Sequence, residues 1–156
     1  LTNTARSVED INFDESKFVK NLNDLRDYLP AHDDKEVILQ DIRSKINAIT
    51  CELFTAYENE YTIFAPMPGC FEVYGLDFMV DTTHNVSLLE VNPGPDFKQT
   101  GDRLKNLIVQ LWEGTCALVI DNTINETLNS QKHEFTKVYD KEASTSKLRG
   151  GGMKMQ

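Results

Sequence analysis

The sequence predicts an α+β fold in which helices pack on an antiparallel sheet. Several segments carry apolar residues every three or four positions, which is typical of amphipathic helices. Between them, a stretch rich in aromatic and branched residues runs into a short turn and a second apolar stretch, which is typical of a β-hairpin. With 156 residues, the chain is long enough for one compact domain with its own core.

Two helices are expected before the hairpin. The first should span residues 14–29 and stop at Pro30. The second should begin at Asp33 or Asp34 and run to about residue 57. Its predicted buried stripe has the strongest helical period in the chain and consists of Ile38, Ile42, Ile46, Ile49, Leu53 and Ala56.

The hairpin is expected to have strands over residues 71–80 and 86–91, joined by a turn over 81–85. After the second strand, a third helix capped by Asp102 should follow, and residues 135–139 should form a last short strand. The apolar side of this third helix is predicted to hold Leu104, Leu107, Ile108, Leu111 and Leu118. We expect residues 1–142 to form the domain and 143–156 a flexible tail.

The bulk composition excludes some classes of function. The net charge of −9 repels phosphate backbones, so direct binding of nucleic acid is not expected. No stretch approaches the ~20 apolar residues of a membrane span. Three cysteines lie far apart, at Cys51, Cys70 and Cys116, which favours reduced thiols in a cytoplasmic protein.

Three oxygen-bearing side chains are expected to meet on one face of the hairpin. If Asp81 and Val86 form the last pair before the turn, Asp77 lies opposite Glu90. Directly opposed residues point to the same face of a sheet. Side chains repeat every two residues along a strand, so Asn92 joins Glu90 on that face.

This arrangement is unfavourable unless something neutralises it. Two opposed carboxylates repel each other, and burying an unpaired carboxylate in apolar strands is expensive. A magnesium ion removes both problems, since it prefers oxygen ligands and binds one or two carboxylates together with substrate phosphates. Spacing alone leaves a second interpretation open, in which Asp77 and Glu90 face water. A one-residue slip in register would also separate them.

The same residues resemble a family signature. The run from Phe71 to Asp81 (FEVYGLDFMVD) followed by Leu88–Asn92 (LLEVN) resembles the tubulin tyrosine ligase family of ATP-grasp ligases. Pro95 fits the continuation of that pattern, and Leu1-Thr2-Asn3 resembles an upstream strand end of the family. The resemblance implies that the chain is the C-terminal part of an ATP-grasp fold.

The resemblance also implies roles for individual residues. Asp77, Glu90 and Asn92 would bind the magnesium ions that bridge the ATP phosphates, and Thr2 and Asn3 would lie beside the nucleotide. ATP and Mg²⁺ are therefore the expected cofactors. The family's reaction phosphorylates a peptide carboxylate with ATP, and an amino-acid amine then attacks the acyl phosphate to form an amide. The acceptor would be a protein such as tubulin, and no residue of this chain is assigned a catalytic role.

Some features depart from the tubulin enzyme. The segment after Asn92 is closer to fungal proteins of the family that associate with cytoplasmic mRNA-processing bodies (P-bodies). The family's lysines and arginines that grip ATP have no counterpart here, so this chain alone is not expected to turn over. An acidic chain also suits the acidic tubulin tail poorly. The alternative hypothesis is a catalytically silent docking module that binds mRNA-decay (decapping) proteins in P-bodies.

Overall fold

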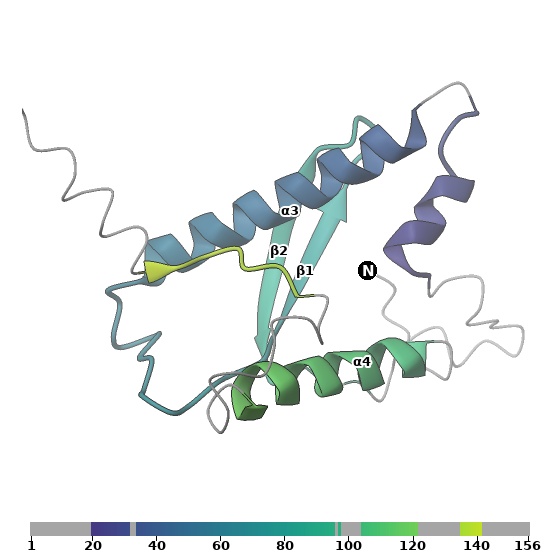
Figure 1. Cartoon of the computed structure of the whole chain (residues 1–156). Coiled ribbons are helices and arrows are strands. Elements are labelled where there is room, and N and C mark those ends of the chain that lie inside the picture. Colours follow the sequence, from purple (N-terminus) through teal and green to yellow (C-terminus); the bar gives the residue numbers. More distant parts are fainter. Residues whose placement is uncertain (1–19, 32–33, 96, 98–103, 122–134, 142–156) are drawn as a thin grey trace, which may run out of the picture.

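The computed structural model describes residues 20–31, 34–95, 97, 104–121 and 135–141. In chain order the described elements are the 3₁₀ helix η1 (Leu22–Asp27), helix α3 (Lys35–Tyr57), strands β1 (Tyr74–Val80) and β2 (Val86–Pro93), helix α4 (Lys105–Cys116) and the π-helical turn η4 (Ala117–Asp121). The two strands form an antiparallel sheet, which confirms the predicted α+β class. In Figure 1, α3 crosses the hairpin and α4 lies near the base of the strands.

Helix α3 forms where its periodicity predicts it. The Asp34 carboxylate accepts a hydrogen bond from the Val37 amide (3.2 Å) and so caps the first turn, as expected of an aspartate at this position. Ile42 is completely buried and Leu39 is 2% exposed. Leu39 was not in the predicted stripe, and Ala56 was wrongly included because it is exposed.

The buried face of α3 is therefore turned relative to the predicted one. At 100° per residue, Leu39 and Ala56 lie on opposite edges of the stripe centred on Ile42. The neighbouring elements cover the Leu39 edge. Four predicted stripe residues are half-buried rather than fully buried, namely Ile38, Ile46, Ile49 and Leu53.

The described part of the predicted first helix is shorter than expected. It is a six-residue 3₁₀ helix, η1, and residues 14–19 lie outside the described part of the chain. Two contacts tie it to the start of α3. The Arg26 guanidinium forms an ion pair with Glu36 (2.7 Å), and the Lys35 ammonium donates a hydrogen bond to the Arg26 carbonyl (2.6 Å). Packing on α3, rather than its own helical propensity, holds this segment.

The hairpin pairs differently at its two ends. Next to the turn, Val80 pairs with Val86, so the predicted Asp81–Val86 pair is wrong by one residue. Further along, Asp77 nevertheless pairs with Glu90, as predicted. A β-bulge between these two regions, with Leu89 as the extra residue, accounts for the change of register.

The register gives the hairpin one apolar face and one polar face. The apolar face carries Tyr74, Leu76, Phe78 and Val80 of β1 and Val86, Leu88, Val91 and Pro93 of β2. It packs toward α3, where the Phe54 ring lies 6.3 Å from the Tyr74 ring. At the other end of the hairpin, Lys45 of α3 donates a hydrogen bond to the His84 carbonyl in the turn (2.9 Å). Helix α3 thus holds the hairpin at its base and at its tip.

The strand boundaries also differ from the expected ones. β1 begins at Tyr74, three residues later than predicted, and β2 continues to Pro93 instead of ending at Val91. Residues 135–139 were expected to form a strand, but they pair with neither of the two strands in the described part of the chain; Tyr139 instead stacks on the Phe54 ring (6.3 Å between centroids). That aromatic contact, rather than a backbone ladder, places this segment.

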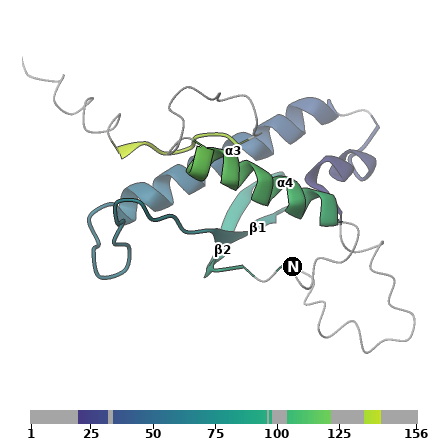
Figure 2. The same ribbon diagram turned by 60° about the horizontal axis from the view of Figure 1, so that its bottom comes forward.

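Helix α4 forms close to its predicted position, but the residues of its predicted apolar side are only partly buried. The expected cap, Asp102, lies outside the described residues, and Leu104 occupies the N-cap position. Leu107 is 53% exposed, and Leu118 lies beyond α4 in η4 and is 40% exposed. Trp112 of α4 makes an edge-to-face contact with Phe97 (6.1 Å), which connects α4 to the segment after the hairpin. In Figure 2, where the bottom of Figure 1 comes forward, α4 lies in front of the two strands.

Three further predictions fall on residues outside the described part of the chain. These are Thr2 and Asn3 beside the nucleotide and the flexible tail over 143–156. Within the described residues, no helix is long and apolar enough to cross a membrane.

Candidate metal centre

The structure brings Asp77, Glu90 and Asn92 together on the polar face of the hairpin. Asp77 and Glu90 are direct cross-strand partners. The Asn92 side-chain amide donates to both of them, at 3.5 Å to Asp77 Oδ2 and 3.3 Å to Glu90 Oε1. All three side chains therefore converge on one small region, each held by a different position of the two-stranded ladder.

The bulge at Leu89 is what makes this convergence possible. With the register that the turn imposes, an unbroken ladder would pair Asp77 with Leu89 and send Glu90 to the apolar face. One extra residue in β2 restores the Asp77–Glu90 pair. The sequence contained a signal for this: apolar residues of β2 fall at Val86 and Leu88 and then, one position out of phase, at Val91.

The two carboxylates repel each other. The pKa of Asp77 is raised above its usual value, first by partial burial of its carboxyl group and then by the nearby Glu90. The Asn92 amide supplies donors but no positive charge. The cluster is therefore short of positive charge, as a site for a cation would be.

The donor set fits a hard divalent cation. Carboxylate and amide oxygens are the ligands that Mg²⁺ and Ca²⁺ prefer, and rotation of the Asn92 amide would present its oxygen in place of its NH₂ group. Among the described residues, no group of three or more His, Cys, Asp or Glu side chains could hold a metal ion. The set supplies at most three ligands. Water and phosphate oxygens would have to complete an octahedral magnesium shell.

The turn next to the site is organised by a third aspartate. Asp81 Oδ1 accepts hydrogen bonds from the Thr83 and Asn85 amides (both 2.8 Å), and its Oδ2 accepts from the Asn85 side chain (3.0 Å). These bonds, those from Asn85 foremost, hold the pKa of Asp81 well below its usual value. His84 in this turn has a φ of 61° and uses its carbonyl to meet Lys45. Its role is thus structural.

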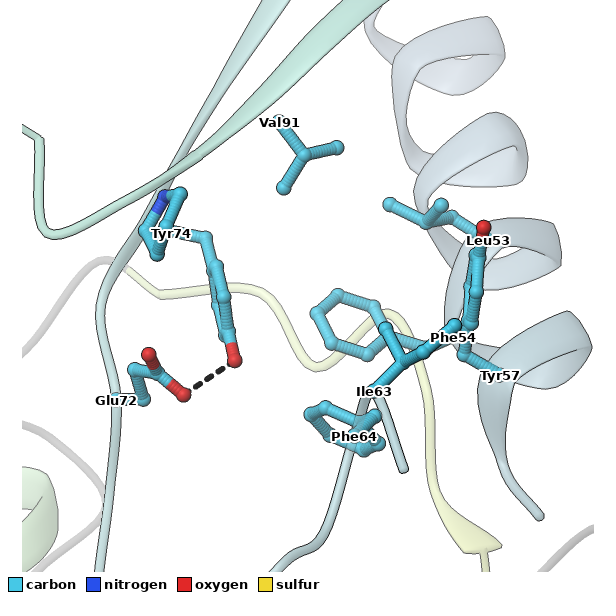
Figure 3. A pocket seen from close by; sticks show the side chains of 9 residues that line it. Leu53, Phe54, Tyr57, Ile63, Phe64, Glu72, Tyr74 and Val91 are labelled. Carbon is cyan, nitrogen blue, oxygen red and sulfur yellow. Dashed lines mark hydrogen bonds between the residues drawn. The ribbon is translucent and has the colours of Figure 1, made fainter. Parts of the chain in front are cut away.

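The opposite face of the hairpin holds a cavity that the sequence reasoning missed. It has a volume of about 380 Å³ and lies between the end of α3, the following loop and the start of β1 (Figure 3). Aromatic and aliphatic side chains dominate its wall, which is formed by Leu53, Phe54, Tyr57, Ile63, Phe64, Glu72, Tyr74, Val91 and Pro93. The signal in the sequence was the aromatic density of residues 54–74.

One polar pair interrupts this apolar wall. The Tyr74 hydroxyl donates a hydrogen bond to the Glu72 carboxylate, and this bond raises the pKa of Tyr74 (Figure 3). Ile63, at the rim, is 72% exposed and Tyr57 is 39% exposed. The cavity is open and on the wrong side of the sheet to share a ligand with Asp77 and Glu90.

Comparisons with known proteins identify relatives. The model of the tubulin-tyrosine ligase family matches residues 3–131. A Saccharomyces cerevisiae protein named probable tubulin–tyrosine ligase PBY1 is 42% identical over 104 residues, which is 64% of this chain and 14% of that protein. A Schizosaccharomyces pombe protein, probable tubulin–tyrosine ligase C12B10.04, is 43% identical over 81 residues, covering 51% of this chain and 20% of the relative.

A more distant relative carries a different name. Tubulin glycylase 3D of Tetrahymena thermophila is 33% identical over 67 residues, which is 43% of this chain and 6% of the glycylase. The chain thus spans a fifth or less of each of these relatives. Their names describe whole proteins, of which this chain matches a short section.

Proposed function

Because this chain belongs to the tubulin-tyrosine ligase family, we propose that its Asp77, Glu90 and Asn92 hold the magnesium ions and ATP phosphates of a ligase. Family membership supports a ligase-type function in general terms. The finer assignment, ATP- and magnesium-dependent joining of an amino acid to a protein carboxylate, draws on the convergence of the three side chains. That convergence is the single observation that carries the proposal.

The chemistry explains why such a cluster would be retained. In the proposed reaction the γ-phosphoryl group of ATP passes to a carboxylate, which leaves ADP and an acyl phosphate. The amine of an amino acid then attacks the acyl carbon, phosphate leaves and an amide forms. Bound magnesium would neutralise the charge of the phosphates. The role of this chain is to present Asp77 and Glu90 as anionic ligands and to orient the Asn92 amide between them.

A conservative substitution of one carboxylate tests this role. In the full-length protein, Glu90→Gln keeps the size of the side chain but removes one anionic ligand. We expect the magnesium-dependent affinity for ATP to fall about 10–100-fold, the range for perturbed metal sites. The measurement is a thermal melt with and without magnesium and ATP, because a ligand that binds only the folded state raises the melting temperature.

The matched control is Glu72→Gln. It makes the same chemical change just before β1, on the side of the hairpin that faces the cavity, and should leave the magnesium–ATP shift intact. An equal shift in wild type and Glu90→Gln would show that Glu90 is no metal ligand. A higher melting temperature of Glu90→Gln without ligand, together with unchanged ATP binding, would favour carboxylates that simply repel each other in water.

A second candidate function draws on a different observation. The open aromatic cavity beside Ile63 and Tyr57 offers an apolar surface for a protein partner. It would suit a docking module for mRNA-decay proteins in cytoplasmic P-bodies. Ile63→Asp should abolish such docking and leave ATP binding unchanged, whereas Glu90→Gln should do the reverse. Co-purification of decapping proteins with each variant separates the two functions.

The remaining assignments belong to the same proposal. Thr2 and Asn3 would lie beside the nucleotide, and the acceptor would be a protein carboxylate, for which the names of the relatives suggest tubulin. A cytoplasmic location accompanies either function. Assays of ATP consumption by the full-length protein with tubulin, and separately with cell extract, test the acceptor.

A further inference from the structure

Gly75 occupies a position of the polar face where a side chain would collide with another part of the chain. It lies directly opposite Asn92 in the hairpin. A Cβ atom built on Gly75 would stand 3.0 Å from the Pro95 Cβ, 3.7 Å from the Pro95 Cγ and 3.8 Å from the Asn92 Cβ. The first of these distances is shorter than ordinary van der Waals contact, so any side chain at position 75 would displace Pro95.

The chain reaches this position because it turns sharply after β2. Gly94 has a φ of 63°, a conformation that glycine adopts without steric penalty. Its amide donates a hydrogen bond to the Val73 carbonyl (3.1 Å), which fastens the turn to the residue before β1. Pro95, whose ring fixes its own φ, is thereby laid over Gly75 and is half-buried.

Pro95 and Gly75 together bound the space around Asn92. Gly75 leaves the cross-strand position beside Asn92 without a side chain, and Pro95, three residues further along, fills that space from above. The Asn92 side chain lies along the face toward Asp77 and Glu90, where its amide donates to both carboxylates. A looser turn would let the amide rotate away into solvent.

We infer that Gly75 is a positioning residue, which lets Pro95 close over the hairpin and hold the Asn92 amide against the two carboxylates. This inference rests on the proposed function, since the amide would be one of the magnesium ligands. It explains why the segment Pro93-Gly94-Pro95 follows Asn92 directly: the turn brings a rigid ring back onto the same face. The alternative is that Gly75 and Pro95 only contribute packing and hence stability.

Three variants of the full-length protein distinguish these explanations. Gly75→Ala inserts the colliding atom, Pro95→Gly removes its partner, and the double variant combines both. We expect Gly75→Ala to weaken magnesium-dependent ATP binding about 10-fold. The double variant should recover part of that loss, because the collision with the Pro95 Cβ is gone. A loss that Pro95→Gly does not reduce would overturn the inference.

Gly69→Ala is the control for stability. Gly69 has a φ of 73°, so alanine is strained there, but a Cβ would meet nothing within 4 Å. This variant should melt at a lower temperature and keep the full shift with magnesium and ATP. A merely structural role requires Gly75→Ala to lose ligand binding only in proportion to its loss of stability. In that case the melting-temperature shift of Gly75→Ala with magnesium and ATP will match that of Gly69→Ala, and the inference fails.

A readout without nucleotide completes the test. The side-chain amide resonance of Asn92 in an NMR spectrum should move in Gly75→Ala and return toward its original position in the double variant. If Gly75→Ala does not fold, Pro95→Gly alone decides the question: unchanged affinity overturns the inference, and a several-fold loss supports it. Wild type without magnesium-dependent binding refutes the proposed function and the inference with it. Binding in wild type that Gly75→Ala leaves intact refutes the inference alone.

Discussion

The two faces of the β1–β2 hairpin are made from alternate residues of the same strands, yet they differ in polarity and in their effect on stability. The face toward α3 is apolar and packs on Phe54 and its neighbours. The other face gathers two carboxylates and an amide, and partial burial together with the neighbouring Glu90 raises the pKa of Asp77. The first face stabilises the fold, whereas the second opposes it. A cluster that opposes folding is a better guide to function than any buried residue of α3.

The largest effect on stability should come from the apolar side. Ile42 of α3 is completely buried, so Ile42→Ala should destabilise the protein by about 2–5 kcal/mol, the usual range for such truncations in a core. Val37→Ala on the same helix is the control, because Val37 is 63% exposed and should change stability by less than about 0.5 kcal/mol. Urea denaturation measures both. Similar losses in the two variants would show that the face assignment of α3 is wrong.

An intermediate effect is expected from the bulge at Leu89, which separates the two registers of the hairpin. Deletion of Leu89 joins Leu88 to Glu90 and leaves a regular ladder in which Asp77 still pairs with Glu90. Stability should change by less than about 1 kcal/mol, but the loss of local twist should misalign the carboxylates. We expect a fall of about 10-fold in magnesium-dependent ATP affinity, measured by isothermal titration calorimetry.

The control for this variant is deletion of Asn59, an exposed residue of the loop after α3. It shortens the chain equally and should leave affinity unchanged. Should the Leu89 deletion bind magnesium and ATP as well as wild type, the bulge would serve only to keep the register, and the regular ladder would suffice for the site.

The smallest effect concerns two aspartates four positions apart in the same hairpin. Asp77→Asn removes a repelled charge and should raise the melting temperature of the ligand-free protein. Asp81→Asn replaces one accepting oxygen with an NH₂ group and removes the charge that strengthens the hydrogen bonds of the turn, so it should lower the melting temperature at pH 7. Because folding lowers the pKa of Asp81, its contribution is complete above about pH 4 and is lost as the pH falls below that value.

The melting temperatures of wild type and Asp81→Asn should therefore converge as the buffer is acidified from pH 5 to lower pH. Melts followed by circular dichroism across this range test the sign. A difference that stays constant or widens on acidification would mean that the Asp81 carboxylate does not stabilise the turn.

Sequence reasoning found the hairpin and its facing carboxylates for reasons that were partly wrong. The turn was assumed to close with an Asp81–Val86 pair, which is off by one residue, and the bulge at Leu89 happened to correct the register. The local alternation of apolar residues in β2 contained this information. A prediction that assumes a regular ladder does not use this change of phase and therefore misses the bulge.

Other predictions failed where long-range packing decides the outcome. The helical period located α3, but which edge of its stripe is buried depends on the elements that cover it, so Leu39 was missed and Ala56 wrongly included. The segment around Tyr139 has strand-like composition, yet the structure places it by stacking on Phe54. Likewise the aromatic density of residues 54–74 was a signal for the cavity beside Ile63, but it does not connect these residues to Val91 and Pro93, which complete the wall.

The attachment of the hairpin to α3 at two points has a consequence for the order of folding. Helix α3 and the hairpin each form from neighbouring residues, while the Lys45–His84 bond joins positions 39 residues apart. Forming it requires closure of the whole intervening loop, an entropic cost that local contacts do not share. Because the pairs of the hairpin are local, we expect the carboxylate face to be assembled within the hairpin before the hairpin docks on α3. Doubling the length of the closed segment between Lys45 and His84 would add only about 0.6 kcal/mol to that closure, so insertions in the loop after α3 should leave the site intact.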